Sequence, residues 1–424
     1  MQKNAPHRIA YVHIGPHKCG TTAIQSHLKS IREALLAQGY LYPTSHDDHA
    51  RLLPVLFWDS AYAPRLGRVE WIETPAGFKN YRQGLMDRLV HEIESCAAPN
   101  LVLCAETLSE FTETEASRMT AFLRQHYDEV RVIAYLREPL AWVDSMAQQA
   151  LKWHGETLDE LFDAPRLPHY KHRLCAFQNA VEPSQFEVRP YEGGAAFDVV
   201  ADFLRTIGID PSDVGAPQSR ANESKSWRSA ILLSSANRLA PIFVNYSFNP
   251  TRAYRFAEAV NLPGEKFVLP KETISAISSK LEEEREWVAS RFGISFARPA
   301  DTRPGRAEWD RGERPALEDH GAILSGLYRS RQNEGALRNL LALRQDGAMT
   351  DEMRAQRLRT GWATATDPWV LHELIQEMRA INHPDLARAR ARRALLMMIE
   401  KPSPGDPPLV YGNPMDRPDL LQDD

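Results

Sequence analysis

Residues 8–28 read RIAYVHIGPHKCGTTAIQSHL, and this stretch decides the fold class. Arg8 to Gly15 is an apolar run typical of a buried strand, and apolar residues recur at helical spacing from Thr22 to Gln38. The same alternation continues, with strands predicted at Asn100–Glu106, Glu129–Arg137 and Gln185–Glu192 and helices at Thr114–Tyr127, Leu140–Lys152 and Asp198–Ile207. Alternating strands and helices are typical of βαβ units, so we predict an α/β fold with a parallel sheet covered on both faces.

Length and composition narrow the class further. A chain of 424 residues fits one large domain plus a smaller one. Hydrophobic residues make up 43% and charged residues 25%, which excludes disordered, collagen-like and coiled-coil chains. The net charge of -5 gives no reason to expect nucleic acid as a partner, so any anion site must be local. None of the four cysteines has CxxC spacing, and neither zinc nor a disulfide framework is expected.

The hydrophobic pattern of the sequence predicts neither a signal peptide nor a membrane helix. The apolar run from Ile9 to Ile14 is interrupted by His13 and is too short for a signal-peptide core. No stretch approaches the roughly 18 apolar residues that a membrane helix needs. We therefore expect no membrane span and a reducing, cytoplasmic setting.

The character of the chain changes near residue 298. We expect a domain at 1–298, a Pro/Gly/Arg-rich linker at 299–316, a helical region at 317–400 and a Pro-rich tail at 401–424. The helical region could form an acceptor wall, a partner surface or the contact of a homo-oligomer. Its predicted helices are Glu318–Arg331, Gly335–Arg344, Thr350–Thr360, Pro368–Arg379 and Pro384–Ile399.

The loop between the first strand and helix has the composition of an anion site. Gly15 and Gly20 have the G-x4-G spacing of a phosphate-binding loop, and Thr21 and Thr22 add hydroxyl donors at a helix N-terminus. Lys18 lies inside the loop, whereas a nucleoside-triphosphatase has its lysine directly after the second glycine. A γ-phosphoryl group needs magnesium, but a sulfonate carries less charge, so one lysine and backbone donors could stabilise a departing phosphate without a metal.

A second anion site is predicted where the third strand ends. Arg137 ends that strand in YLREP (Tyr135 to Pro139), and Ser145 follows about two helical turns into the next segment. Ligand contacts concentrate at the carboxyl ends of parallel strands, and a guanidinium is well suited to phosphate. The alternative is that Arg137 forms a structural salt bridge with Glu138 or another acid and that Ser145 is an ordinary helix serine.

These strings together resemble the bacterial-type sulfotransferases that use 3′-phosphoadenosine 5′-phosphosulfate (PAPS). Their first loop reads close to HIGxxKTGTT, and this chain departs from it at Cys19, where threonine is usual. The resemblance covers about Arg8 to Gly293, including VRPYEGG from Val188 and RANES from Arg220. It implies a three-layer α/β/α sheet of the P-loop type and transfer of sulfonate to a hydroxyl of a carbohydrate or other small molecule.

The resemblance also implies roles for residues. Lys18 would neutralise charge on the bridging oxygen, and Arg137 and Ser145 would bind the 3′-phosphate. Arg220 would approach the nucleotide, unless it is an ordinary exposed arginine. The residues expected around the 5′-phosphosulfate are Gly15, His17, Lys18, Gly20, Thr21 and Thr22.

The general base is left open among three residues. His46 and His49 lie in YPTSHDDHARLL (Tyr42 to Leu53), and Glu106 ends the second strand. His49 is preferred because it could point inward at a helix start. A metal site built from His46-Asp47-Asp48-His49 is the weaker interpretation, since such carboxylates commonly cap helices, and no metal is expected. Alternative functions are a P-loop kinase or nucleotide hydrolase, and an inactive nucleotide-binding interaction module.

Overall fold

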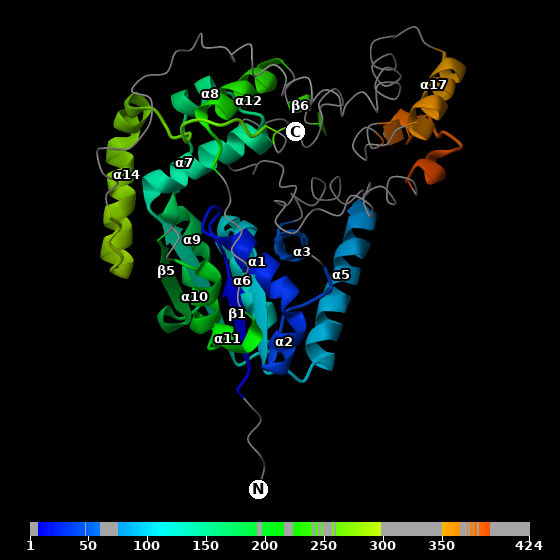
Figure 1. Cartoon of the computed structure of the whole chain (residues 1–424). Coiled ribbons are helices and arrows are strands. Elements are labelled where there is room, and N and C mark those ends of the chain that lie inside the picture. The colour runs from blue at the N-terminus through cyan, green and yellow to red at the C-terminus, as the bar shows by residue number, and fades with distance from the viewer. Residues whose placement is uncertain are drawn as a thin grey trace.

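The computed structural model contains one central sheet of five parallel strands (Figure 1). Their order is β2-β3-β1-β4-β5, and the strands are β1 (Ile9–His13), β2 (Tyr40–Leu41), β3 (Asn100–Cys104), β4 (Glu129–Arg137) and β5 (Phe186–Tyr191). The structure describes residues 7–46, 48–59, 75–192, 197–215, 224–239, 242–244, 247–248, 257, 260–297, 350–364, 371, 374–375, 377–379 and 381–390. The prediction of an α/β fold with a parallel sheet is confirmed.

The register of the sheet brings the predicted site residues to one edge. β1 lies between β3 and β4, with His13 opposite Cys104 on one side and Ile133 on the other. The chain leaves β1 towards β2 and β3 and later returns on the far side through β4. Such a reversal of direction opens a crevice at the carboxyl ends of the strands, where α/β proteins bind ligands.

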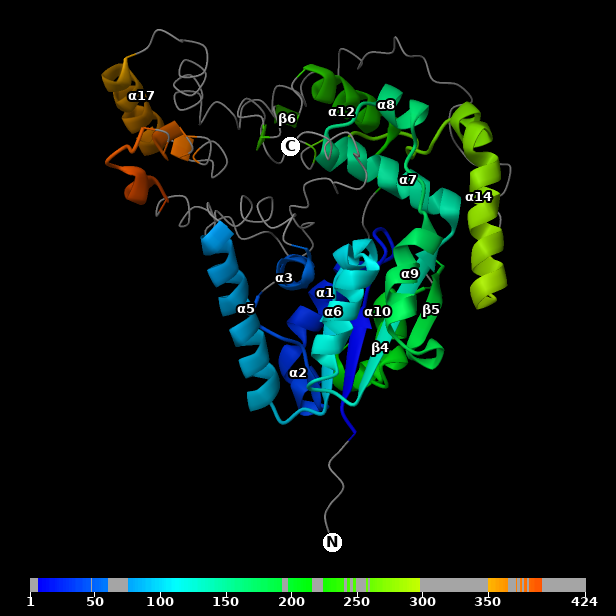
Figure 2. The ribbon, with the colours of Figure 1, turned by 180° about the vertical axis from the view of Figure 1, so that it is seen from behind.

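Helices cover both faces of the sheet. α1 (Thr21–Ser30) contacts α10 (Val199–Thr206) on one face, and α6 (Glu113–Leu123) contacts α9 (Tyr170–Ala180) on the other, as Figures 1 and 2 show from opposite sides. Strand residues such as Ala10, Val12 and Leu103 are fully buried between the two layers. The remaining helices around the sheet are α2 (Arg32–Ala37), α3 (His49–Phe57), α5 (Pro75–Ser95), α11 (Pro211–Val214) and the short 3₁₀ helices η2 (Glu106–Glu110) and η4 (Pro183–Gln185).

A group of helices lies beyond the carboxyl edge of the sheet. α7 (Pro139–Gln149) crosses above the loop that follows β1 and continues into a π-helical turn, η3 (Ala150–His154) (Figure 1). The helix predicted at Leu140–Lys152 is confirmed, although α7 begins at Pro139, with proline in the first turn, and gives way to η3 after Gln149. The other elements of this group are α8 (Leu158–Asp163), α12 (Trp227–Leu239), α14 (Lys271–Phe292) and the two-stranded β6 (Phe243–Val244) and β7 (Ser247–Phe248).

The described residues contain two separate hydrophobic cores. The larger one, with hydrophobics packed against it, extends from Ile9 to Phe296. The smaller one lies near the C-terminus and includes Leu358 of α17 (Asp351–Thr364) and Leu374. α17 agrees with the helix predicted from Thr350. The predicted linker, the helices at 318–344 and the tail lie outside the described residues.

Candidate functional site

The loop from Ile14 to Gly20 has a backbone that only particular residues tolerate. Gly15 and Gly20 have φ of 88° and 87°, and Lys18 has φ of 66° in the same left-handed region. A Cβ on Gly15 would lie 2.8 Å from Glu106 Cα, and one on Gly20 would lie 2.8 Å from Val199 Cγ1. The glycine spacing thus lets the loop pack closely against η2 on one side and α10 on the other.

The start of α1 has the features of an anion site. Gly20 caps the helix without a side-chain hydrogen bond, and no acidic residue lies in the first turn. Thr21 is buried and its Oγ1 makes no hydrogen bond to the described residues, while Thr22 is half-buried. A helix N-terminus carries a partial positive charge and unsatisfied N–H groups. The orphaned hydroxyl and the helix end together form a cradle suited to phosphate or sulfonate.

Lys18 is half-buried, and its ammonium forms neither a hydrogen bond nor an ion pair with a described residue. Burial lowers the pKa of Lys18 to about 8; the charge of Glu106 opposes this shift and that of Arg137 adds to it. Cys19, the departure from the family pattern, is fully buried in the core, and its thiol donates to the His17 carbonyl over 3.5 Å. Burial raises the pKa of Cys19 to about 12, so this thiol is a neutral packing group beneath the loop.

Arg137 lies against the same loop. Its Nη1 donates to the Lys18 carbonyl over 3.4 Å, and its guanidinium lies 5.5 Å from the centre of the Tyr191 ring. The alternative of a salt bridge to Glu138 is wrong, because Glu138 pairs with Arg285 at 2.6 Å. Among the described residues Arg137 has no acidic partner. Ser145 is half-buried on α7, with no hydrogen bond from its side chain to a described residue.

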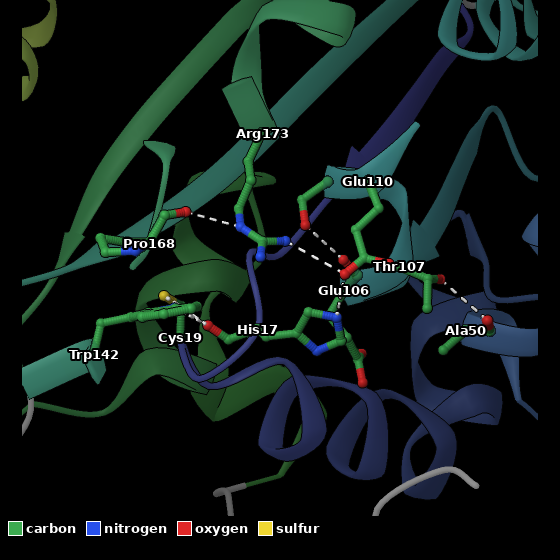
Figure 3. Close-up of polar contacts among 10 residues, drawn as sticks. His17, Cys19, Ala50, Glu106, Thr107, Glu110, Trp142, Pro168 and Arg173 are labelled. Carbon is green, nitrogen blue, oxygen red and sulfur yellow. Dashed lines mark hydrogen bonds and ion pairs between the residues drawn. The ribbon is translucent and has the colours of Figure 1, made fainter. Parts of the chain in front are cut away.

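His17 holds the loop in place rather than facing its anion cradle. Its Nε2 lies 3.1 Å from Glu110 Oε1, which also pairs with Arg173 Nη1 at 3.3 Å (Figure 3). The indole Nε1 of Trp142 donates to the His17 carbonyl over 2.7 Å. Burial alone would raise the pKa of Glu110, but its two cationic partners lower it below the usual value.

This network was not predicted from the sequence. Glu110, Trp142 and Arg173 lie on three different elements, and pairing them requires the folded structure. The one available signal was that Glu110 closely follows Glu106 after a buried strand, at the edge where ligands bind.

His49 begins α3 and is buried, as the sequence predicted, but both ring nitrogens have partners. Nε2 lies 3.2 Å from the Pro43 carbonyl, and Nδ1 accepts from the Cys104 N–H over 3.5 Å. A carbonyl only accepts, so Nε2 carries the proton. Burial lowers the pKa of His49 to about 4, and the ring is a neutral bridge between α3 and β3.

Glu106, unlike His49, has a side-chain atom without a hydrogen-bond partner among the described residues, and that atom could accept a proton. It is buried at the carboxyl end of β3, and its Oε2 makes no hydrogen bond to the described residues. Burial raises the pKa of Glu106, and the charges of His17 and Lys18 partly offset that effect. Figure 3 shows Glu106 beside His17, on the loop side of η2.

The remaining candidates are less central. His46 is half-buried, and its Nδ1 accepts from the Asp48 N–H over 3.0 Å. Asp48 caps α3 by accepting from the Ala50 N–H over 2.8 Å, which supports the capping interpretation over the metal site. Asp47 and Arg220 lie outside the described residues.

No family model, curated protein sequence or solved structure matches the chain. Within the described ranges, no helix is both long enough and apolar enough to cross a membrane. The fold and the geometry of the site therefore carry the functional argument.

Proposed function

We propose that the chain is a PAPS-dependent sulfotransferase with a P-loop-type donor site, which moves a sulfonate group to a hydroxyl of a carbohydrate or other small-molecule acceptor. The observation that carries the proposal is the contact between Arg137 and the loop that bears Lys18. Two cationic side chains, neither with an ion-pair partner among the described residues, thus flank the start of α1. A donor with phosphates at both ends of an adenosine needs such a pair.

The residues fit the two ends of that donor. The cradle of Gly20, Thr21 and Thr22 suits the 5′ end, and its orphaned Thr21 hydroxyl is a donor in need of an acceptor. Arg137 and Ser145 suit the 3′-phosphate, since a guanidinium can bind phosphate through two parallel hydrogen bonds. When bound, PAPS supplies a sulfonate attached through a bridging oxygen to the 5′-phosphate.

Lys18 then stabilises the leaving group. Its ammonium lies in a half-buried position, where charge interactions are stronger than in water. Negative charge develops on the bridging oxygen as its bond to sulfur breaks, so a fixed cation there lowers the barrier. The lysine's position inside the loop favours this role over the triphosphate contact of a kinase.

Glu106 is the general base that the geometry favours. Its free carboxylate oxygen accepts the proton of the acceptor hydroxyl while the acceptor oxygen forms its bond to sulfur and the bridging bond breaks. The raised pKa of Glu106 makes it a stronger base than an exposed glutamate. His46 is the second choice, because His49 has no ring nitrogen left to accept a proton.

Calorimetric titration tests the donor site. We expect 3′-phosphoadenosine 5′-phosphate (PAP) to bind without metal and more tightly than ATP with magnesium. Arg137→Ala should weaken PAP binding at least about tenfold, because a charge-assisted hydrogen bond contributes about 1.5–3 kcal/mol. An equal or better response to ATP would favour a kinase or hydrolase. PAP binding without sulfonate transfer to any hydroxyl would favour an inactive binding module.

A further inference from the structure

A second unpaired lysine lies above the loop. Lys152, in η3, is half-buried and forms neither a hydrogen bond nor an ion pair with a described residue. Burial lowers the pKa of Lys152 to about 8, and the charges of Lys225 and Lys18 lower it further. The ammonium groups of Lys18 and Lys225 are therefore close enough to repel that of Lys152.

The helix that carries Lys152 turns one face to the loop. Trp142, Ser145 and Gln149 recur at spacings of three and four, which puts them on one side of α7. Trp142 hydrogen-bonds the His17 carbonyl, so this side is the one that contacts the loop. Lys152 follows three residues after Gln149, in the π-helical turn that continues α7, and the charge of Lys18 in the loop acts on it. Its π-helical turn closes at Gly155, and such turns occur frequently at functional sites.

Among the described residues, no acid forms an ion pair with Lys152. Glu156 is paired with Arg166, and Glu110 is shared by His17 and Arg173. His154, two residues after Lys152, has a buried Nδ1 with no hydrogen-bond partner among the described residues. Glu106 is the acid whose charge acts on Lys18. An uncompensated, partly buried ammonium is costly, and an anionic ligand would offset that cost.

We propose that Lys152 binds a negatively charged group of the acceptor, so that the acceptor is an anionic carbohydrate with a carboxylate or sulfate near the hydroxyl that is sulfonated. This inference rests on the proposed function. In the proposed function, Lys18 binds the 5′ end of the donor and Arg137 binds its 3′-phosphate. Arg137 precedes α7, whereas Lys152 lies at the far end of the α7–η3 segment. On this inference the acceptor enters from the end of the segment that carries Lys152.

The test compares matched acceptors. We measure the transfer of radiolabelled sulfonate from PAPS to two sets of acceptors. One set is uronate-containing oligosaccharides, and the other is the same oligosaccharides after their carboxylates are reduced to alcohols. Among the pairs to which sulfonate is transferred, we expect kcat/KM to be at least tenfold higher for the acidic oligosaccharide than for its reduced counterpart. Lys152→Gln should lower the ratio of the two kcat/KM values about tenfold, while kcat/KM for the reduced oligosaccharide changes less than twofold. Lys152→Arg should restore the preference, and Lys171→Gln, which removes an exposed lysine on α9, should leave it unchanged.

Three results would overturn the inference. These are equal rates with both members of each pair, transfer to neutral members alone, and a Lys152→Gln variant whose affinity for PAPS falls while its acceptor preference persists. PAP affinity, measured on the same variants, separates this inference from the proposed function. If the wild-type protein bound no PAP and sulfonated no acceptor of either kind, the proposed function itself would be contradicted.

Discussion

At the scale of single residues, the loop after β1 depends on two glycines and on one pair of distant side chains. Gly15 and Gly20 both have positive φ, as expected of a tight anion loop with their spacing. His17 contacts Glu110 although 93 residues separate them, so this pairing could not be predicted. For the same reason His49 was a plausible base until its two hydrogen-bond partners were located.

We expect Lys18 to make PAP binding sensitive to pH. Its pKa of about 8 means that the ammonium is charged below that pH and loses its proton above it. We expect the Kd for PAP to rise about twofold from pH 7 to 8 and by up to about tenfold per pH unit above pH 9, because binding requires the charged form. Lys18→Arg should remain flat to pH 10, since arginine stays protonated.

Calorimetry across this pH range checks the assignment. Lys152→Arg is the matched control, because Lys152 also has a pKa of about 8 but is not expected to contact PAP. If Lys152→Arg abolished the alkaline loss and Lys18→Arg did not, the two lysines would have exchanged roles.

Gly20 is expected to tolerate no side chain. Gly20→Ala would put a Cβ 2.8 Å from Val199 Cγ1 at a φ of 87°. Gly293→Ala is the matched control: its φ is 68° and nothing lies within 4 Å of the added Cβ. We expect Gly293→Ala to lower the free energy of unfolding by about 1–2 kcal/mol, the strain alone, and Gly20→Ala to cost at least about 1 kcal/mol more. Equal losses in urea denaturation would show that the loop accommodates the methyl group.

At the scale of elements, periodicity predicted the strands and helices that define the sheet but not how they end. The run at Thr22–Gln38 was predicted as one helix, and the structure divides it into α1 and α2. The two-residue β2 was missed because it is too short for an alternating pattern. The π-helical turn after α7, which ends at Gly155, was also missed.

α7 positions the loop through Trp142. Trp142→Phe keeps the ring in the core and removes the indole N–H that binds the His17 carbonyl. We expect it to lower the free energy of unfolding by about 1–3 kcal/mol, because the carbonyl is left without this donor. PAP binding should weaken as well, since the loop loses a support.

Trp287→Phe on α14 is the control, because no hydrogen bond joins the Trp287 indole N–H to a described residue. Urea denaturation and calorimetry compare the two variants. Equal effects of both substitutions on PAP affinity would contradict a positioning role for Trp142.

At the scale of the whole molecule, the two hydrophobic cores share no residue. The division of the chain near residue 298 was predicted from composition, and it stays a prediction because the linker lies outside the described residues. Which side chains meet at the site could not be predicted in this way, since the contacts join segments that lie 93 to 125 residues apart. The β1 loop, for example, is contacted by residues of η2, β4 and α7.

Leu374 tests whether the smaller core unfolds independently. It is fully buried, and Leu374→Ala should cost that core about 2–5 kcal/mol. Differential scanning calorimetry should show two transitions, of which the variant lowers one and PAP raises the other. A single transition shifted by both would indicate one cooperative unit.

A crystal structure of the protein with PAP would test the donor site directly. We expect one nucleotide spanning the carboxyl edge of the sheet, with its 5′-phosphate against Lys18 and the start of α1 and its 3′-phosphate against Arg137 and Ser145. A nucleotide that met only one of these groups, with Lys18 and Arg137 directed into different cavities, would contradict this expectation.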